Sequence, residues 1–375
     1  MNNSANSNSD FWHGKRCLIT GADGFLATHL ADKLVKSGAL VWGTVRNRTR
    51  LLSRLDLFKL RDRISLFYCD IRDFRTLFDI LAAEHIDTVF HLAATSIVMV
   101  ASRTPLATLE SNILGTANIL EACRQTDVQR VVVAASDKAY GDHRSSLPYT
   151  EKHALRGLHV YDCSKSCADL ITQTYFFQFG LPARVTRLCN IYGPGDLNFS
   201  RLIPGSITRL LDKKAPVIHE GQGPMKREYI HVADAAEAYL QIAKSIDLSD
   251  RQNIPSTGEE AYAYCAYNVG SGEAGIKTTS DMIETIQNFM GKHFEPTVIP
   301  KQRKRYDYLE LPDQFLDSSK VREETGWEPR VALEDGLLET ISWYQTHRDT
   351  LRPLFEAEIR RQEEEQIIRQ AAVGA

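Results

Sequence analysis

Short runs of β-branched residues alternate with longer segments of helical period from about residue 15 of this chain onward. Six of the runs predict strands: KRCLIT, LVWGTVR, ISLFYCD, DTVFHLA, RVVVAAS and ARVTRLC. Amphipathic segments that predict helices lie between them, including residues 26–37, 74–84, 112–125 and 165–178. Because this alternation is typical of βα units, we predict an α/β fold with a doubly wound parallel sheet.

The regular pattern loosens after Asn190, where glycine and proline become frequent and the loops lengthen. A chain of 375 residues can hold one large core and a smaller lobe. We expect a disordered tail over 1–13 and the parallel-sheet domain mainly over 14–190. A smaller C-terminal substrate-binding lobe, with some return to the sheet, is expected mainly over 191–350, and a charged helix and tail over 351–375. Residues 247–262 are rich in turn formers and predict a solvated loop.

Composition narrows the partners that this chain can have. Its formal net charge of −3 gives no support for binding to nucleic acid or to an anionic membrane. No apolar run approaches the ~20 residues of a membrane span, and the polar N-terminus lacks the apolar segment of a signal peptide. Seven scattered cysteines fit neither a disulfide framework nor a metal site. We therefore expect a cytoplasmic protein with reduced thiols, no metal and a small ligand.

The first predicted strand runs directly into GADGFLATHL, which places Gly21, Gly24 and Ala27 at a strand-to-helix turn. Glycine allows the tight turn, and the helix N-terminus then presents free N–H groups to a pyrophosphate. The pattern therefore predicts a dinucleotide site of the Rossmann type. Arg46 and Arg48 end the next strand, where an acidic residue would bind the ribose of NAD. Since arginine pairs with a 2′-phosphate, we favour NADP over NAD; a solvated loop with NAD bound is the alternative.

Asp70 ends the third predicted strand and is a candidate acceptor for the adenine amino group. An interpretation of equal weight is that it caps a turn or helix. The residues that we expect at the dinucleotide are Gly21, Gly24, Phe25, Leu26, Arg46, Asp70, Ile71, Leu92, Ala93, Ala94, Tyr161 and Lys165.

Two further segments carry groups that can move protons. YDCSK places Tyr161 and Lys165 four residues apart at a helix start, so both side chains leave one face. A nearby ammonium favours the phenolate and makes the tyrosine a proton acceptor. AASDKAYG follows a buried strand directly and places Ser136, Asp137 and Lys138 at its end, where a stable core needs no such groups. The simpler alternative is that Asp137 caps the next turn and Lys138 faces solvent.

The chain resembles the extended short-chain dehydrogenase/reductase superfamily of sugar-nucleotide epimerases and dehydratases from about residue 14 to 345. The motifs that carry the resemblance are TGADGFLATHL, FHLAA, ESNILGTANILEA, SDKAYG, YDCSK, RLCNIYGPGD, REYIHVAD and LDSSKVREETGWEPRVALEDGLLETISWY. The resemblance implies a catalytic triad of Ser136, Tyr161 and Lys165. Tyr161 would take a proton from a sugar hydroxyl, Lys165 would hold the nicotinamide ribose, and Ser136 would bind the reacting oxygen.

SDKAYG resembles the 4,6-dehydratases, and its Asp-Lys pair is similar to the CDP-glucose 4,6-dehydratase type. DLNFSRLIPG and YLELPDQFLDSSKV favour the same branch, whereas REYIHVAD is closer to the epimerases and Arg46 is unlike a typical NAD site. The resemblance implies a lyase acting on a nucleotide-diphosphate hexose. Transient C4 oxidation, loss of water across C5 and C6, and hydride return to C6 would give a 4-keto-6-deoxy sugar, with tightly bound cofactor recycled.

In this reaction Asp137 is expected to act as the acid and Lys138, in its neutral form, as the base. Asn190, Arg201 and Arg227 are the candidates for binding the substrate, the arginines because guanidinium binds diphosphate. Superfamily members often pair through two long helices, which predicts a homodimer through residues 112–125 and 165–178. The alternatives are a 4- or 2-epimerase that uses the same triad, and a nucleotide-binding protein without activity.

Overall fold

The computed structural model describes residues 10–46, 52–143, 147–247, 258–300 and 313–373. The chain forms two compact units. The larger contains residues 1–191, 228–276 and 308–331, and the smaller contains residues 192–227, 277–307 and 332–375. The chain passes between these units five times, and three of the crossings fall within β7 (Asn190–Tyr192), β9 (Lys226–His231) and β11 (Ile276–Thr278), which pair in the order β11-β9-β7.

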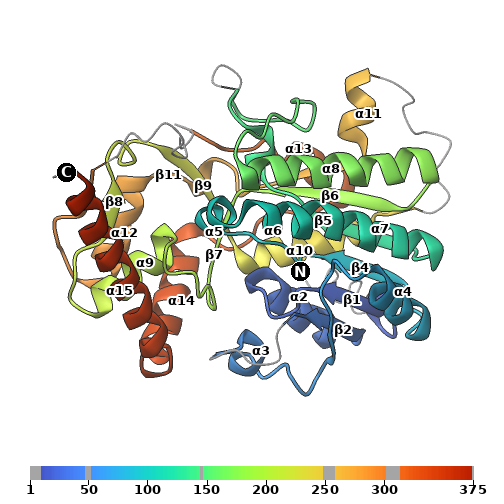
Figure 1. Cartoon of the computed structure of the whole chain (residues 1–375), viewed down its shortest axis with the longest axis horizontal. Coiled ribbons are helices and arrows are strands. Elements are labelled where there is room, and N and C mark those ends of the chain that lie inside the picture. The colour runs from blue at the N-terminus through green and yellow to red at the C-terminus, as the bar shows by residue number, and fades with distance from the viewer. Residues whose placement is uncertain (1–9, 47–51, 144–146, 248–257, 301–312, 374–375) are drawn as a thin grey trace. The chain divides into compact units, whose positions relative to one another are not determined.

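A seven-stranded parallel sheet forms the centre of the larger unit, in the order β10-β6-β5-β4-β1-β2-β3 (Figure 1). Its strands are β1 (Arg16–Thr20), β2 (Leu40–Val45), β3 (Ser65–Tyr68), β4 (Thr88–His91), β5 (Arg130–Ala134), β6 (Ala183–Leu188) and β10 (Ala266–Val269). The predicted parallel sheet and its six predicted strands are thus confirmed. The strand order reverses at the β1–β4 neighbours, so a crevice for a ligand is expected at the carboxyl ends of these strands.

Helices cover both faces of this sheet. Leu18 and Ile19 are neighbours in β1 and point to opposite faces, where they join different buried clusters. One cluster includes α2 (Phe25–Lys36) and α10 (Val232–Lys244), and the other includes α4 (Phe74–Ala83), α7 (Gly115–Gln125) and part of α8 (Val160–Phe179). Strands buried on both faces must be apolar throughout, which explains the continuous runs in the sequence.

Shorter elements complete the larger unit. They are α3 (Arg54–Leu57), α5 (Val98–Arg103), α6 (Pro105–Leu109), the π-helical turn η1 (Glu110–Leu114), the 3₁₀ turns η2 (Asp137–Tyr140) and η3 (Glu273–Gly275), α11 (Gly258–Tyr264) and α13 (Ser319–Thr325). The solvated loop expected over 247–262 therefore ends sooner, because its last residues belong to α11.

The predicted N-terminal tail is also shorter than expected. Residues 10–12 are helical, and Trp12 is fully buried, with its ring 5.9 Å from that of Phe90. Burial of so large an apolar ring is strongly favourable, which fixes this part of the segment against the sheet. The prediction of disorder was wrong for residues 10–12.

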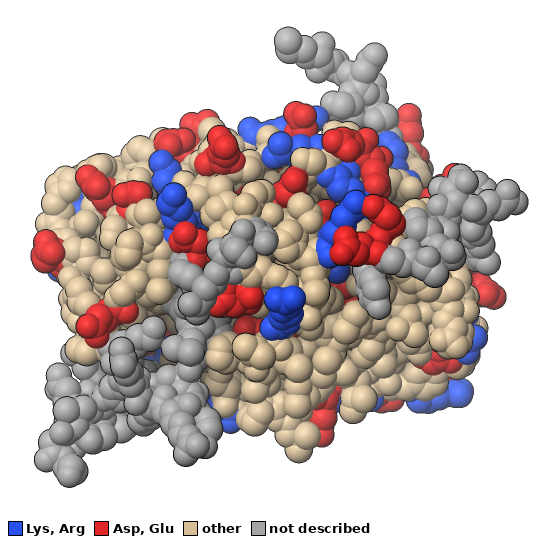
Figure 2. Space-filling model, turned by 90° about the horizontal axis from the view of Figure 1, so that it is seen from above, with Lys and Arg blue, Asp and Glu red and all other residues tan. Residues whose placement is uncertain are grey.

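The smaller unit contains α9 (Leu202–Leu211), α12 (Thr279–Met290), α14 (Leu333–Thr346) and α15 (Arg348–Val373), with a parallel pair of β8 (Val217–His219) and β12 (Thr297–Ile299). Phe199 packs on Phe355 of α15, with ring centroids 4.6 Å apart. Within the described ranges, no helix combines the length and the apolar character needed to cross a bilayer. On the face in Figure 2, basic and acidic side chains are interspersed.

Candidate active site

The turn between β1 and α2 allows a ligand to approach its backbone closely. Gly21 has φ +69°, and a Cβ at this position would lie 2.9 Å from Cα of Ala93. Gly24 is the N-cap of α2 and has no side chain to occupy the first N–H groups of the helix. A helix N-terminus left open in this way is a site for phosphate oxygens. The turn therefore fits a dinucleotide, and Phe25 and Leu26 supply its first helical N–H groups.

The end of β4 lies against this turn. The Thr20 hydroxyl accepts from the backbone N–H groups of Leu92 and Ala93, each at 3.1 Å. His91 binds the hydroxyls of Thr20 (2.8 Å) and Thr116 (3.1 Å) through its two ring nitrogens. Burial lowers the pKa of His91 to about 3, so the ring is neutral. It is a satisfied core histidine and does not carry the chemistry of the site.

The predicted adenine and ribose ligands lie at the ends of β2 and β3. Arg46 is exposed, and its charge helps to lower the pKa of Asp70, although the larger cause is the hydrogen bond from Arg72. The Asp70 carboxylate accepts from the backbone N–H of Arg72 at 3.0 Å and from its guanidinium at 2.9 Å. This is the turn-capping arrangement, while contact with adenine stays a prediction. Ile71 is buried, and Arg48 lies outside the described residues.

Helix α8 carries Tyr161 and Lys165, one turn apart and both buried. The Lys165 ammonium donates to the carbonyl of Ala134 at 2.6 Å, which places it at the carboxyl end of β5. Burial lowers the pKa of Lys165 to about 8. Asn112 also anchors α8, because its side-chain amide donates to the Ser164 hydroxyl at 2.9 Å and accepts from the Thr95 N–H. Asn112 therefore has a structural role, linking the segment after β4 to α8.

The segment after β5 folds into η2, which presents the predicted acid and base. Ser136 is its N-cap: the Ser136 hydroxyl accepts from the Lys138 N–H at 3.2 Å and donates to the Asp137 carboxylate at 3.0 Å. Asp137 is only 3% exposed, so it does not sit in a solvated cap. The Lys138 ammonium is half-buried and donates to the side-chain oxygen of Gln314, so it does not simply extend into solvent.

Helix α8 and η2 are held together, because the Ser166 hydroxyl donates to the Ala139 carbonyl at 2.9 Å. The end of β5, the whole of η2 and the first turns of α8 therefore form one continuous region. It contains a serine, a phenol, two ammonium groups and a carboxyl group, all predicted from the sequence. Such a set can accept a proton from an alcohol and move others between neighbouring groups.

Two buried carboxyl groups in this region were not predicted. Burial raises the pKa of Asp162 to about 6, with Lys138 opposing and Asp137 adding to the increase. Burial likewise raises the pKa of Glu228 to about 7, and the nearby Asp137 raises it further. Asp162 had a local signal, since it follows Tyr161 directly in YDCSK. Glu228 likewise follows Arg227 directly in REYIHVAD, but its proximity to Asp137 could not be read from the sequence.

The predicted substrate residues lie in both units. Asn190 belongs to the larger unit, where its amide donates to the Glu228 carbonyl at 3.1 Å. Arg201 and Arg227 belong to the smaller unit. Arg201 pairs with buried Asp196 at 2.9 Å, and Arg227 is only 5% exposed, which removes surface ion pairing as its explanation.

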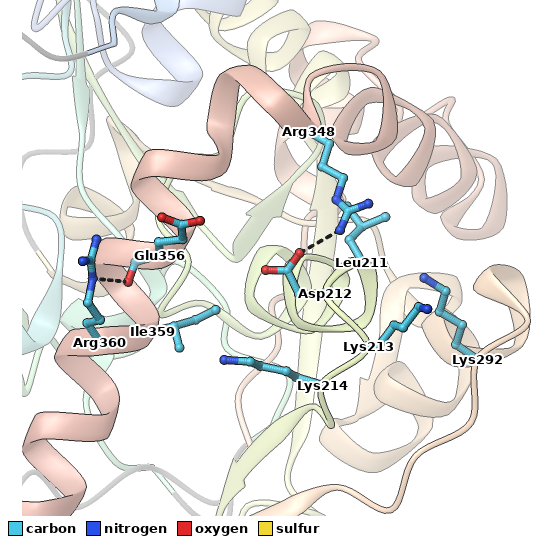
Figure 3. A pocket seen from close by; sticks show the side chains of 9 residues that line it. All are labelled: Leu211, Asp212, Lys213, Lys214, Lys292, Arg348, Glu356, Ile359 and Arg360. Carbon is cyan, nitrogen blue, oxygen red and sulfur yellow. Dashed lines mark hydrogen bonds and ion pairs between the residues drawn. The ribbon is translucent and has the colours of Figure 1, made fainter.

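The smaller unit also contains a hollow of about 630 Å³ (Figure 3). It is lined by Leu211, Asp212, Lys213, Lys214, Lys292, Arg348, Glu356, Ile359 and Arg360. The Lys292 ammonium donates to the Leu210 carbonyl at 2.9 Å, and Arg348 pairs with Asp212 at 3.0 Å. Cations at a helix C-terminus satisfy its free carbonyls, so this hollow is best explained as the capped end of α9. Across the described ranges, no cluster of three metal-binding side chains occurs.

The sequence model of the family described as GDP-mannose 4,6 dehydratase matches residues 18–340. A CDP-glucose 4,6-dehydratase from Salmonella typhimurium is 28% identical over 348 residues, which cover 90% of this chain and 92% of that protein. A solved double mutant of a dTDP-glucose 4,6-dehydratase from Streptomyces venezuelae, with NAD bound, has a TM-score of 0.76 and 26% identity, covering 90% of this chain and 99% of that chain. A UDP-glucose 4-epimerase from Thermus thermophilus, in complex with NAD, has a TM-score of 0.71 and 26% identity, covering 88% and 99%.

Proposed function

This chain belongs to the GDP-mannose 4,6 dehydratase family, and we propose that it removes water from a nucleotide-diphosphate hexose to give a 4-keto-6-deoxy sugar. The family places it among nucleotide-sugar enzymes of the extended short-chain dehydrogenase/reductase fold. The observation that carries the finer proposal is the pair of Asp137 and Lys138 in η2, directly after Ser136 and against α8. An epimerase needs no acid and base at this position, whereas a dehydratase needs both.

The dinucleotide would be held by the β1–α2 turn and by the ends of β2, β3 and β4. When bound, nicotinamide supplies the acceptor and later the donor of a hydride. Solved relatives hold NAD, whereas exposed Arg46 favours a cofactor with a 2′-phosphate, so we propose NADP with NAD as the alternative. Identification by mass of the dinucleotide that copurifies with the protein tests this choice.

The residues of the triad act on the alcohol at C4. Tyr161 accepts the O4 proton, which requires its phenol to ionise more readily than at its usual pKa of ~10. Lys165 favours the phenolate by its charge, and it also positions the nicotinamide ribose. Ser136 donates a hydrogen bond to the same oxygen. Its hydroxyl bonds Asp137 in this structure, so binding of substrate would exchange one acceptor for another.

The second pair acts after a ketone has formed at C4. The ketone acidifies the C5 proton, which Lys138 removes, while Asp137 gives a proton to the departing hydroxyl at C6. The C5–H and C6–O bonds break, a C5–C6 double bond forms, and water leaves. Return of the hydride to C6, with a proton going back to C5, then gives the 4-keto-6-deoxy sugar. A protonated acid, Asp137, beside a neutral base, Lys138, meets these requirements, and η2 carries both groups.

We further propose that Asn190 binds the sugar or its phosphate and that Arg201 and Arg227 bind the diphosphate. Seven free cysteines fit a reducing compartment, so we place the protein in the cytoplasm. A homodimer through residues 112–125 and 165–178 is supported by exposed apolar side chains, among them Leu114 at the end of η1 and Leu170 and Phe177 on α8.

Incubation with CDP-, dTDP-, GDP- and UDP-hexoses, followed by mass spectrometry, tests the reaction. We expect a product lighter by one water from one of these sugars, and the change Lys138→Met should lower its formation at least ~100-fold. An isobaric product would show the second candidate, a 4- or 2-epimerase, which the similarity to a UDP-glucose 4-epimerase favours. If the Tyr161→Phe variant still bound nucleotide and its turnover equalled that of the wild type, the protein would be a binding protein without this chemistry.

A further inference from the structure

We propose that Gln314 is a positioning residue of the dehydration step, holding Lys138 and the backbone of Asp137 in one fixed arrangement. This inference rests on the proposed function of Asp137 and Lys138. Gln314 is fully buried and belongs to the same unit as η2, although it lies 176 residues beyond Lys138 in the chain.

One amide group contacts both members of the pair. The Lys138 ammonium donates to Oε1 of Gln314, and Nε2 of Gln314 donates to the Asp137 carbonyl at 2.9 Å. The opposite orientation of the amide would set its NH₂ against the lysine and its oxygen against the carbonyl. Only one orientation therefore satisfies both contacts, and the amide provides its donor and its acceptor on separate atoms.

The residues that follow Gln314 are held by three hydrogen bonds. Two of them are backbone bonds with Tyr149: Tyr149 N–H donates to the Phe315 carbonyl at 3.1 Å, and Asp317 N–H donates to the Tyr149 carbonyl at 2.9 Å. The Leu316 N–H donates to the carboxylate of Glu228 at 2.9 Å. Because these bonds hold the segment in place, Gln314 can hold Lys138 in a defined position, which a mobile residue could not do.

Gln314 also acts on the protonation of Lys138. An amide oxygen accepts a stronger hydrogen bond from an ammonium than from a neutral amine, so Gln314 favours the charged form. The charge of Asp162 on α8 interacts with those of Lys138 and Asp137 on η2. Asp137 also interacts with Glu228 on β9 and with Cys189. Asp162 thus acts on Lys138 through its charge, and Gln314 binds the ammonium directly.

Two substitutions of Gln314 should move Lys138 in opposite directions. Gln314→Leu removes the acceptor, so Lys138 should titrate at lower pH. Gln314→Glu places an anion beside the ammonium, so Lys138 should titrate at higher pH. The titration can be followed by the NMR signal of the lysine Cε in protein labelled with ¹³C-lysine, with Lys138→Met assigning the signal. Gln287→Leu, which removes another buried glutamine in the smaller unit, is the matched control.

Activity gives the second measurement. In both variants kcat for water loss should fall about 10- to 100-fold with KM little changed, because displacement of a catalytic group by about 1 Å has effects of this size. The ascending limb of the pH–rate profile should move with the Lys138 titration, to lower pH in Gln314→Leu and to higher pH in Gln314→Glu.

Three outcomes separate the inference from the proposed function. Opposite shifts of the Lys138 signal, with the matching loss of kcat, support the role of Gln314. An unchanged Lys138 titration in both variants overturns it, even if activity falls, because a merely structural role would lower activity without moving the titration. Failure of the unmodified protein to release water from any sugar of the panel overturns the proposed function itself, before any variant is compared.

Discussion

Buried ionisable side chains gather where β4 and β5 end, and each costs free energy that a stable core would avoid. His91, Asp137 and Lys165 are 3%, 3% and 6% exposed. His91 escapes this cost by staying neutral, with both ring nitrogens bonded. Lys165 has one hydrogen bond to a carbonyl, and its pKa is lowered by burial. A buried ammonium so weakly compensated agrees with the catalytic role that we propose for Lys165.

Lys165→Met should therefore abolish activity and stabilise the protein. The pKa of Lys165 is lowered from 10.5 to about 8, so between these values the folded state binds the proton less tightly than the unfolded chain. The free energy of unfolding of the wild type therefore increases as the pH rises through this window. Below the window, the destabilisation caused by the buried ammonium is fully present. We expect the free energy of unfolding to rise by about 1–2 kcal/mol at pH 7 in the variant.

Urea denaturation at pH 7 and pH 10 measures this difference, which should shrink at the higher pH. A variant that is less stable than the wild type at pH 7 would contradict the view that Lys165 is buried at a cost.

At the scale of elements, we expect cofactor binding to depend most on the β1–α2 turn. Gly21→Ala would put a methyl group 2.9 Å from Cα of Ala93 and force a side chain onto φ +69°. Backbone atoms cannot yield easily, so the turn should move away from β4. We expect the affinity for the dinucleotide to fall at least about 10-fold, which corresponds to about 1.4 kcal/mol.

Gly14→Ala is the matched control, because Gly14 has φ +70° and nothing lies within 4 Å of its added Cβ. This variant bears the backbone strain of about 1 kcal/mol without the clash, so it should keep its affinity. Titration by fluorescence quenching measures both variants, and equal affinities would exclude close approach at Gly21 as the cause.

At the scale of the whole molecule, the exposed apolar face of α8 predicts self-association. Leu170 and Phe177 are 43% and 39% exposed and lie two turns apart on that helix. Light scattering should show a dimer for the wild type and a monomer for Leu170→Glu with Phe177→Glu, since a charge cannot be buried unpaired in an interface. Leu338→Glu, on α14 at 47% exposure, should leave the dimer intact. A monomeric wild type would refute the prediction.

The chain by itself determined the six strands, the open glycine turn and the polar groups of SDK and YDCSK. These features are local: periodicity, turn geometry and helical spacing act between residues a few positions apart. The tertiary structure decided that β10 adds a seventh strand beside β6, that Trp12 is core, and that Gln314 meets Lys138. These contacts join segments that are far apart in the sequence, and they form only when those segments pack together. No local pattern of residues marks them, and the length of the intervening loop does not either, because the entropy of loop closure depends only weakly on length.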